Sequence, residues 1–385
     1  MKPGTIPDGW TSAPLGELCG RITTGKLDAN AMVADGEYPF FTCARESYRI
    51  NRYAFDTEAL LVSGNGANVG YVHYYKGKFN AYQRTYVLSE FTADVHFLKM
   101  FLDRNLQDRI RVEVNAGNTP YITMGTLTEM GVVLPNDAAE QRAIATALSD
   151  VDGLLGGLDR LIAKKRDLKQ AAMQQLLTGQ TRFPGFHGEW EVKRLGDVGK
   201  FLKGSGVTKD QTRSGTLACV RYGELYTQHN DVVRDFHSWI SPVVAATAVR
   251  LEQGDILFAG SGETKEEIGK CAAFVSDVEA YGGGDIVILR PDDSDSVFLG
   301  YYLNTGSIAR QKASRGQGDA VVHISSSALS DVRCKLPPLP EQTAIAEVLT
   351  EMDAELAGIE QRREKTRALK QAMMQELLTG KTRLI

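Results

Sequence analysis

A near-identical segment occurs twice in this chain and constrains its fold more than any other feature. A shift of 201 positions places residues 140–182 on residues 341–383, and 23 of the 43 aligned pairs are identical. Self-similarity of this strength indicates a structural unit that is used twice. The 385 residues therefore alternate two variable segments with two copies of the repeat, in the order 1–134, 135–182, 183–338 and 339–385.

The repeats predict two long helices. Apolar residues recur in them at alternating spacings of four and three, which is the seam of a coiled coil. A glycine follows the last apolar turn of each copy (Gly179 and Gly380), where a helix commonly ends in a left-handed residue. Each helix then extends for about 40 residues, or about 60 Å. The seam positions that contact a partner helix are Ile144, Leu148, Val151, Leu155, Ile345, Leu349, Met352 and Leu356.

Two local features bear on the first helix. Asp137 and Glu140 have the spacing of a capping box, which predicts a helix start at this point. Gly153, Gly156 and Gly157 fall inside the helix, where each costs about 1 kcal/mol relative to alanine. Their counterparts in the second copy are also small. Two interpretations stay open: the helices approach each other closely at these residues, or the first helix breaks here into a hairpin.

The arrangement of repeats and variable segments predicts the fold class. A long helix with an apolar stripe is not stable alone, and the second copy can supply its partner. Because each copy follows one variable segment, we expect a pseudo-twofold relationship and antiparallel helices. Short runs such as 59–62, 85–88 and 285–289 are apolar and bounded by Gly, Asn or Asp, which favours β-strands. We therefore predict an α+β protein, with two β-rich domains separated by two long helices that form an antiparallel coiled coil.

Known catalytic patterns do not fit this sequence. Residues 118–121 (Asn-Thr-Pro-Tyr) differ by one residue from the Asn-Pro-Pro-Tyr motif of amino-methyltransferases, but no recognisable cofactor domain accompanies them. The five cysteines and six histidines form no zinc or nucleophile pattern. No apolar run reaches the roughly 18 residues of a membrane span. We predict no catalytic residue, no metal site and no membrane association, and the isolated cysteines favour a reducing cytoplasm.

Local features indicate nucleic-acid binding although bulk charge does not. The net charge is −4, and neither variable segment is net basic, with 13 basic and 14 acidic residues in the first and 17 and 20 in the second. In each, however, a basic helical stretch leads into a loop rich in Gly, Asn or Gln. These stretches carry Arg104, Arg109 and Arg111, and Arg310, Lys312 and Arg315. A solvated helix face is the alternative interpretation.

Asn, Gln and Arg are the side chains that read base edges, and basic side chains neutralise phosphates. On this ground we predict candidate DNA contacts in both variable segments. They are Asn65, Asn68, Gln83, Arg84, Asn115 and Asn118 in the first, and Lys265, Lys270, Arg315 and Gln317 in the second.

Three stretches carry a family resemblance: LKQAAMQQLLTGQTR at 168–182, PLPEQTAIAEVL at 338–349 and TRFPGFHGEWEVKRLGDV at 181–198. With them the chain resembles the DNA-specificity subunit of type I restriction–modification systems. The resemblance implies two target recognition domains, 1–134 and 183–338, that each read one half of a bipartite double-stranded DNA site. The helical regions would set the spacing and dock two modification (methyltransferase) subunits, and restriction subunits would join the full complex.

The same resemblance places S-adenosylmethionine on the methyltransferase partner, so this chain is expected to bind no cofactor and to be non-catalytic. Two other classes of function remain open from the residues alone. One is an adaptor whose two variable segments bind protein partners, which suits the net acidity. The other is a fused single-chain methyltransferase.

Overall fold

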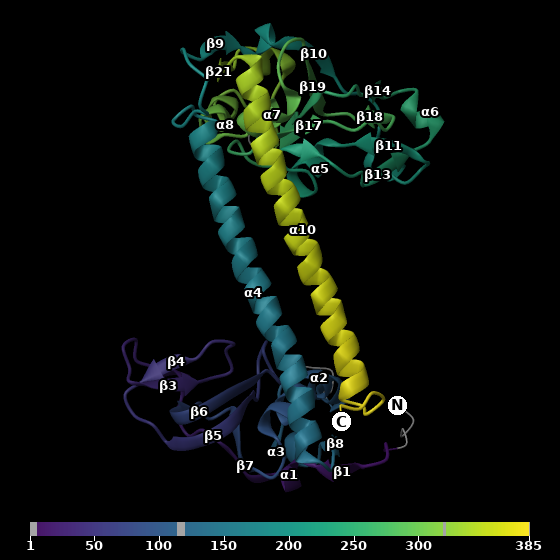
Figure 1. The fold of residues 1–385 in the computed structure, drawn as a ribbon. Coiled ribbons are helices and arrows are strands. Elements are labelled where there is room, and N and C mark those ends of the chain that lie inside the picture. Colours follow the sequence, from purple (N-terminus) through teal and green to yellow (C-terminus); the bar gives the residue numbers. More distant parts are fainter. Residues whose placement is uncertain (1–5, 114–119, 319–320, 385) are drawn as a thin grey trace. The chain divides into compact units, whose positions relative to one another are not determined.

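The computed structural model describes residues 6–113, 120–318 and 321–384. The chain forms two compact units, one of residues 1–160 and 360–385 and the other of residues 161–359. Each unit contains one of the variable segments, which we call the first head (1–134) and the second head (183–338), together with part of each long helix (Figure 1). Among the described residues, every helix is too short or too polar to cross a bilayer.

The long helices are α4 (Ala138–Leu176) and α10 (Leu339–Leu377), of 39 residues each. Ion pairs within the first unit join Asp152 to Lys370 at 2.7 Å and Asp159 to Arg363 at 3.4 Å. Residue numbers rise along α4 as they fall along α10, so the helices are antiparallel. In the second unit, Lys169 binds Asp353 at 2.5 Å, which repeats the Lys370–Asp152 pair 201 positions away. The prediction of two long packed helices is confirmed.

The glycines inside α4 correct both interpretations made from the sequence. The helix continues through Gly153, Gly156 and Gly157, so it does not break. A Cβ atom built on Gly153 or Gly157 would meet no described atom within 4 Å. These positions therefore face open space instead of a close helix–helix contact.

The seam residues nearest each head pack into the core of that head. Ile144 and Leu148 are fully buried and belong to the first head's core, where the end of α10 also contributes Leu377 and Leu378. Ile345 and Leu349 take the same place in the second head beside the end of α4. Farther along the seam Leu356 is also buried, and Val151, Leu155 and Met352 are half-buried. Each head is thus completed by the start of one repeat and the end of the other.

We call the place where the start of one repeat and the end of the other meet at a head a junction. A buried ion pair joins the two repeats at each junction. Both carboxylate oxygens of Glu140 accept hydrogen bonds from the Arg383 guanidinium, at 2.6 and 2.7 Å. Glu341 and Arg182 form the same pair at 2.8 and 2.6 Å. The glutamates are only 5% and 1% exposed. The capping-box role predicted for Glu140 is wrong, because its carboxylate accepts hydrogen bonds from Arg383 instead. At the start of the helix, Asp137 Oδ1 accepts a hydrogen bond from the backbone amide of Ala139 at 2.8 Å.

The glutamine that follows each buried glutamate ties the helix to its own head. Gln141 donates from Nε2 to the Pro135 carbonyl at 2.8 Å and accepts the Asp94 amide at 2.8 Å. Gln342 makes the equivalent bonds to Pro337 and Asp295, at 2.8 and 3.0 Å. The Glu-Gln pair shared by both repeats therefore links three parts of the chain at each junction.

The other end of each repeat turns at a glycine, as predicted. Gly179 and Gly380 both have φ of +70°. A Cβ at Gly179 would lie 3.3 Å from the Trp190 ring, and one at Gly380 would lie 3.0 Å from the Trp10 ring. The left-handed backbone and the close approach of a tryptophan both require glycine here.

The first head is built on a six-stranded sheet, in the order β2-β7-β5-β6-β3-β4. Helix α2 (Val95–Glu113) covers one face of this sheet around Leu60, Val62 and Leu88, and aromatic and aliphatic residues bury the other. A separate pair, β1 with β8, leads directly into α4. The strands are β1 (Trp10–Pro14), β2 (Cys19–Thr24), β3 (Tyr38–Phe41), β4 (Tyr48–Ile50), β5 (Phe55–Ser63), β6 (Val72–Ala81), β7 (Thr85–Phe91) and β8 (Gly131–Pro135), with short helices α1 (Leu15–Leu18), η1 (Ala29–Ala31) and α3 (Met124–Thr128).

The second head has a five-stranded sheet, β10-β19-β15-β17-β12, and a four-stranded sheet, β13-β11-β18-β14. Two helices, α7 (Ser296–Tyr302) and α8 (Gly306–Ala313), stand where the first head has α2. The pair β9 with β21 leads into α10, as β1 with β8 leads into α4.

The strands of the second head are β9 (Glu191–Arg194), β10 (Gly199–Lys203), β11 (Leu217–Val220), β12 (Val232–Val233), β13 (Ser238–Ile240), β14 (Val249–Arg250), β15 (Ile256–Ala259), β16 (Ser261–Gly262), β17 (Cys271–Phe274), β18 (Ala280–Gly282), β19 (Ile286–Pro291), β20 (Val322–His323) and β21 (Arg333–Leu336). Its remaining short helices are η2 (Leu195–Asp197), η3 (Lys209–Gln211), α5 (Tyr222–Thr227), α6 (Pro242–Ala245) and α9 (Ser326–Ser330).

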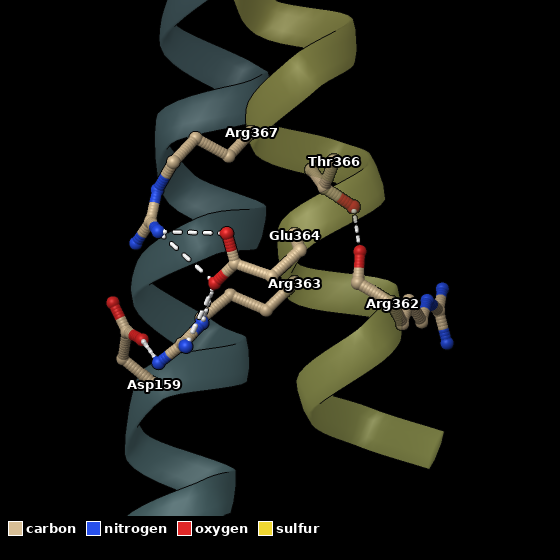
Figure 2. Close-up of polar contacts among 6 residues, drawn as sticks. All are labelled: Asp159, Arg362, Arg363, Glu364, Thr366 and Arg367. Atoms are coloured by element: carbon tan, nitrogen blue, oxygen red, sulfur yellow. Dashed lines mark hydrogen bonds and ion pairs between the residues drawn. The ribbon is translucent and has the colours of Figure 1, made fainter. Parts of the chain in front are cut away.

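The junction pairs predict a clear ranking of arginine substitutions. Arg182→Ala leaves the buried Glu341 carboxylate without its bidentate partner, which we expect to cost on the order of 3–5 kcal/mol in the free energy of unfolding. Arg363→Ala is the matched control, because Arg363 pairs with Asp159 and Glu364, whose side chains are more than half exposed (Figure 2). Such exposed pairs contribute about 0–1 kcal/mol. Denaturant unfolding of both variants measures the difference, and equal losses would contradict the importance of the junction.

Candidate nucleic-acid interface

In the first head, three segments meet at one end of the six-stranded sheet. They are the loop 64–70 between β5 and β6, the turn 82–84 between β6 and β7, and residues 120–122. The Gly64 amide donates to the Arg84 carbonyl at 2.8 Å, and the Ile122 amide donates to the Gly64 carbonyl at 2.9 Å. We call these residues the first loop cluster.

The second head builds the same junction from residues 260–270, 283–285, 317–318 and 321–324, which we call the second loop cluster. The Gly260 amide donates to the Asp285 carbonyl at 2.7 Å, and the Ile324 amide donates to the Gly260 carbonyl at 2.9 Å. A Cβ would lie 2.2 Å from the Arg84 carbonyl oxygen at Gly64, and 2.8 Å from that of Asp285 at Gly260. The backbone construction of the two clusters is therefore shared, although their side chains differ.

Several side chains of the first loop cluster are open to solvent. Gln83 and Arg84 are exposed, and Asn65 is half-buried. Gln83 and Arg84, with Gly64, line a cavity of about 320 Å³. Tyr121, which pairs with Asn65 in an isolated bridge, is 65% exposed. Three of the predicted contact residues thus come together at this end of the sheet, while Asn115 and Asn118 lie outside the described residues.

Asn68 also belongs to the first loop cluster, but its amide is engaged inside the protein. Its Nδ2 donates to the Cys43 carbonyl at 3.1 Å, and its Oδ1 accepts from Arg45 Nε at 3.4 Å. Arg45 is an exposed residue that the sequence analysis did not select. It lies 23 residues before Asn68, in the loop between β3 and β4, and only the folded sheet brings the two together.

The second loop cluster contains predicted DNA-contact residues and also acidic residues. Lys265 and Gln317 are exposed, and Lys270 is half-buried. Arg315 is half-buried and donates from Nη1 to the Gln311 carbonyl at 2.8 Å and from Nη2 to the Asp331 carbonyl at 3.3 Å. The loop also exposes Glu263, Glu266 and Glu267. Lys265 and Gln317 are thus the predicted side chains most available to a ligand.

One of the basic helical residues, Lys312, is buried and cannot contact a phosphate, contrary to the sequence interpretation, and a second, Arg104, is bound to the long helix α10. Lys312 is only 2% exposed, and its Nζ donates to the Gly269 carbonyl at 2.5 Å. Burial lowers the pKa of this lysine. Arg104 donates to Gln375 Oε1 on α10 at 2.6 Å. These residues support the head and its junction with the helices.

A polar network holds the second head against the helices of its unit. Asp353 of α10 accepts hydrogen bonds from Lys169 of α4 at 2.5 Å and from Tyr301 of α7 at 2.5 Å. Burial alone raises the pKa of the Asp353 carboxyl, but the bonds from Lys169 and Tyr301 outweigh it and lower that pKa. Lys169 also lines a cavity of about 270 Å³ with Asp231, Lys270 and Lys312, so this network reaches the base of the second loop cluster.

His229 gives the second head a predicted pH dependence. The ring is 3% exposed, its Nε2 has no hydrogen-bond partner among the described residues, and burial, with the nearby His237, lowers its pKa from 6.5 to about 4. The unfolded chain binds this proton more readily, so stability is complete above about pH 6.5 and falls as the pH drops toward about 4.

Because of His229, the free energy of unfolding should fall by on the order of 1–2 kcal/mol between about pH 7 and pH 5. Unfolding of the wild type and His229→Gln at both pH values measures it, and the variant should lose less stability on acidification. His187→Gln, at an exposed histidine, is the control. An unchanged pH dependence in His229→Gln would contradict the assignment.

A family model for the type I restriction modification DNA specificity domain matches residues 7–162 and 187–367. The chain belongs to this family, and the resemblance found in the repeats is confirmed. The two matched segments each begin near the tryptophan of a head and extend into a long helix. The match also confirms the predicted class, a specificity subunit with no catalytic role of its own. No group of three His, Cys, Asp or Glu side chains among the described residues could hold a metal ion.

Individual relatives agree with this assignment. The type I restriction enzyme EcoDI specificity subunit of Escherichia coli is 39% identical over 184 residues, which cover 47% of this chain but only 40% of that protein. The MjaVIII specificity subunit of Methanocaldococcus jannaschii is 24% identical over 98% of this chain and 94% of its own. The crystal structure of an S subunit from M. genitalium has the same fold, with a TM-score of 0.65, 17% identity and 97% coverage of both chains.

Proposed function

We propose that each head reads one half of a bipartite double-stranded DNA sequence through its loop cluster. The observation that carries this proposal is the construction of the two clusters. They share the backbone bonds at Gly64 and Gly260 but present different exposed side chains. Two equivalent supports with different polar groups suit a protein that recognises two different short sequences.

The readers in the first head are Asn65, Gln83 and Arg84, with Asn115 and Asn118 as further candidates. In the second head they are Lys265 and Gln317, supported by Lys270 and Arg315. Neither head is net basic, so phosphate attraction from this subunit is modest and long-range steering comes mainly from its partners. Sequence discrimination comes from the loop side chains.

The two long helices set the distance between the half-sites and dock two methyltransferase subunits. These methyltransferase subunits bind S-adenosylmethionine. Restriction subunits join this assembly in the cytoplasm. Exposed leucines on the helices support docking. Leu154 and Leu369 are 43% and 56% exposed in the first unit, and Leu161 and Leu168 are 39% and 47% exposed in the second. Large apolar side chains exposed along a helix are typical of a surface that a partner covers.

The two heads should lose discrimination independently. Gln83→Ala with Arg84→Ala is expected to relax one half-site, and Lys265→Ala with Gln317→Ala the other, since a good bidentate base contact is worth about 1–3 kcal/mol. A randomised-duplex selection with the assembled methyltransferase complex, scored for each half separately, measures this. Each double variant is the control for the other. An equal loss of base preference in both half-sites would contradict the proposal that each head reads its own half-site.

The spacing role predicts the effect of a longer coil. One heptad inserted after Leu158 and one after Ile359 keep the seam in phase and lengthen each helix by about 10 Å. At about 3.4 Å per base pair, the gap between the half-sites should grow by roughly three base pairs while both halves persist. Selection on duplexes of varied gap measures this. An unchanged gap in an assembled complex would show that the helices do not set the distance.

A further inference from the structure

The loop between β3 and β4 is joined to the first loop cluster by two side-chain contacts and to strand β6 by a third. The Asn68 amide donates to the Cys43 carbonyl at 3.1 Å, and the Cys43 thiol lies 3.5 Å from the Arg84 carbonyl oxygen. His73 Nε2 lies 2.9 Å from the Ala44 carbonyl oxygen, to which it donates. Burial lowers the pKa of His73, so its ring makes this bond in the neutral form. These contacts hold the backbone of residues 43–44, directly before Arg45, in place.

The Arg45 guanidinium is itself oriented by Asn68 of the cluster and by Tyr71, which directly follows segment 64–70. Its Nε donates to Asn68 Oδ1 at 3.4 Å, and its Cζ lies 5.7 Å from the centre of the Tyr71 ring. Arg45 is exposed, and Tyr71 is 37% exposed. The Nη1 and Nη2 atoms have no hydrogen-bond partner among the described residues. One edge of the guanidinium is therefore held by an amide and one face by a ring, which leaves the outer edge available to a ligand.

A held guanidinium edge fits one base better than the others. Two N–H groups in a fixed plane match two neighbouring acceptors, and in the major groove guanine offers O6 and N7. Adenine places a donor beside its N7, so the same edge cannot bind it in this way. A phosphate can accept the same pair of N–H groups, but a mobile cation on the surface neutralises it as well, so phosphate binding does not require a held guanidinium.

We propose that Arg45 is a specificity-determining residue that binds a guanine in the half-site of the first head. Asn68 and Tyr71 are positioning residues that act through Arg45. This assignment rests on the proposed reading of DNA by the loop clusters. It also changes the role of Asn68, because both polar groups of its amide are engaged within the protein.

The test is a randomised-duplex selection with the complex assembled from this chain and its methyltransferase subunits. The wild type should select guanine at a defined position of the half that Gln83→Ala with Arg84→Ala relaxes. Arg45→Ala should reduce this preference between about five- and 150-fold. Arg45→Lys keeps the charge but lacks the paired donors, so it should lose most of the same preference. Arg52→Ala, at an exposed arginine of the same head outside the cluster, is the matched control.

The positioning role has its own measurement. Asn68→Ala should weaken the guanine preference less than Arg45→Ala does, and adding it to Arg45→Ala should cause no further loss, because Asn68 acts through the arginine. Additive losses would overturn this role.

Two outcomes would overturn the proposal that Arg45 binds a guanine in the half-site of the first head. One is an equal loss of affinity for all duplexes in Arg45→Ala with unchanged base preference, which is the behaviour of a phosphate contact. The other is a first-head half-site without a selected guanine. A wild-type complex that selects no bipartite sequence at all would instead remove the proposed function, so the two failures are distinguishable.

Discussion

The fold depends on an ion pair that each repeat can complete only with the other repeat. Glu341 at the start of α10 is bound by Arg182, 159 residues earlier, and Glu140 at the start of α4 is bound by Arg383, 243 residues later. A buried carboxylate without its partner is strongly destabilising, so neither head is complete with one repeat alone. The internal symmetry of the chain follows from this, because both junctions need the same Glu-Gln start and the same Gly-x-Thr-Arg end.

The heads are under a different constraint. Their backbones repeat the bonds around Gly64 and Gly260, whereas the side chains above those bonds differ in size, charge and hydrogen-bonding groups. Such a division allows a head to change what it binds without disturbing how it joins the helices. The first loop cluster presents Gln83 and Arg84, with Arg45 beside it, and the second combines Lys265 with several carboxylates. The two clusters therefore offer chemically different surfaces on the same support.

Much of this organisation could be predicted from the sequence because the signals were periodic or repeated. The heptad seam gave the long helices, and Gly179 and Gly380 marked their ends. The errors came from residues whose environment depends on distant parts of the chain. Gly153 and Gly157 face open space, Lys312 is buried beneath the Gly269 carbonyl, and Glu140 binds an arginine from the far end of the chain. Helical periodicity alone does not show which face of a helix another segment will cover.

The candidate site was predictable only in part, for the same reason. Gln83, Arg84, Lys265 and Gln317 are exposed as expected, and glycine-rich patterns mark the loops of Lys265 and Gln317 in the sequence. Arg45 was missed because its neighbours Asn68 and Tyr71 come from another loop, between β5 and β6, and no local pattern joins them to it. Asn68 was selected for its side-chain type, but the structure shows that its amide holds other residues in place.

In the proposed function, this chain directs its complex to a DNA sequence of two separate halves. Mapping of methylated bases across the genome, in cells with and without this protein, tests it most directly. We expect a methylated motif of two short defined sequences separated by a gap of fixed length, which disappears when the protein is absent. A methylation pattern that is the same in both cells, or a lost motif that is one uninterrupted sequence, would contradict it.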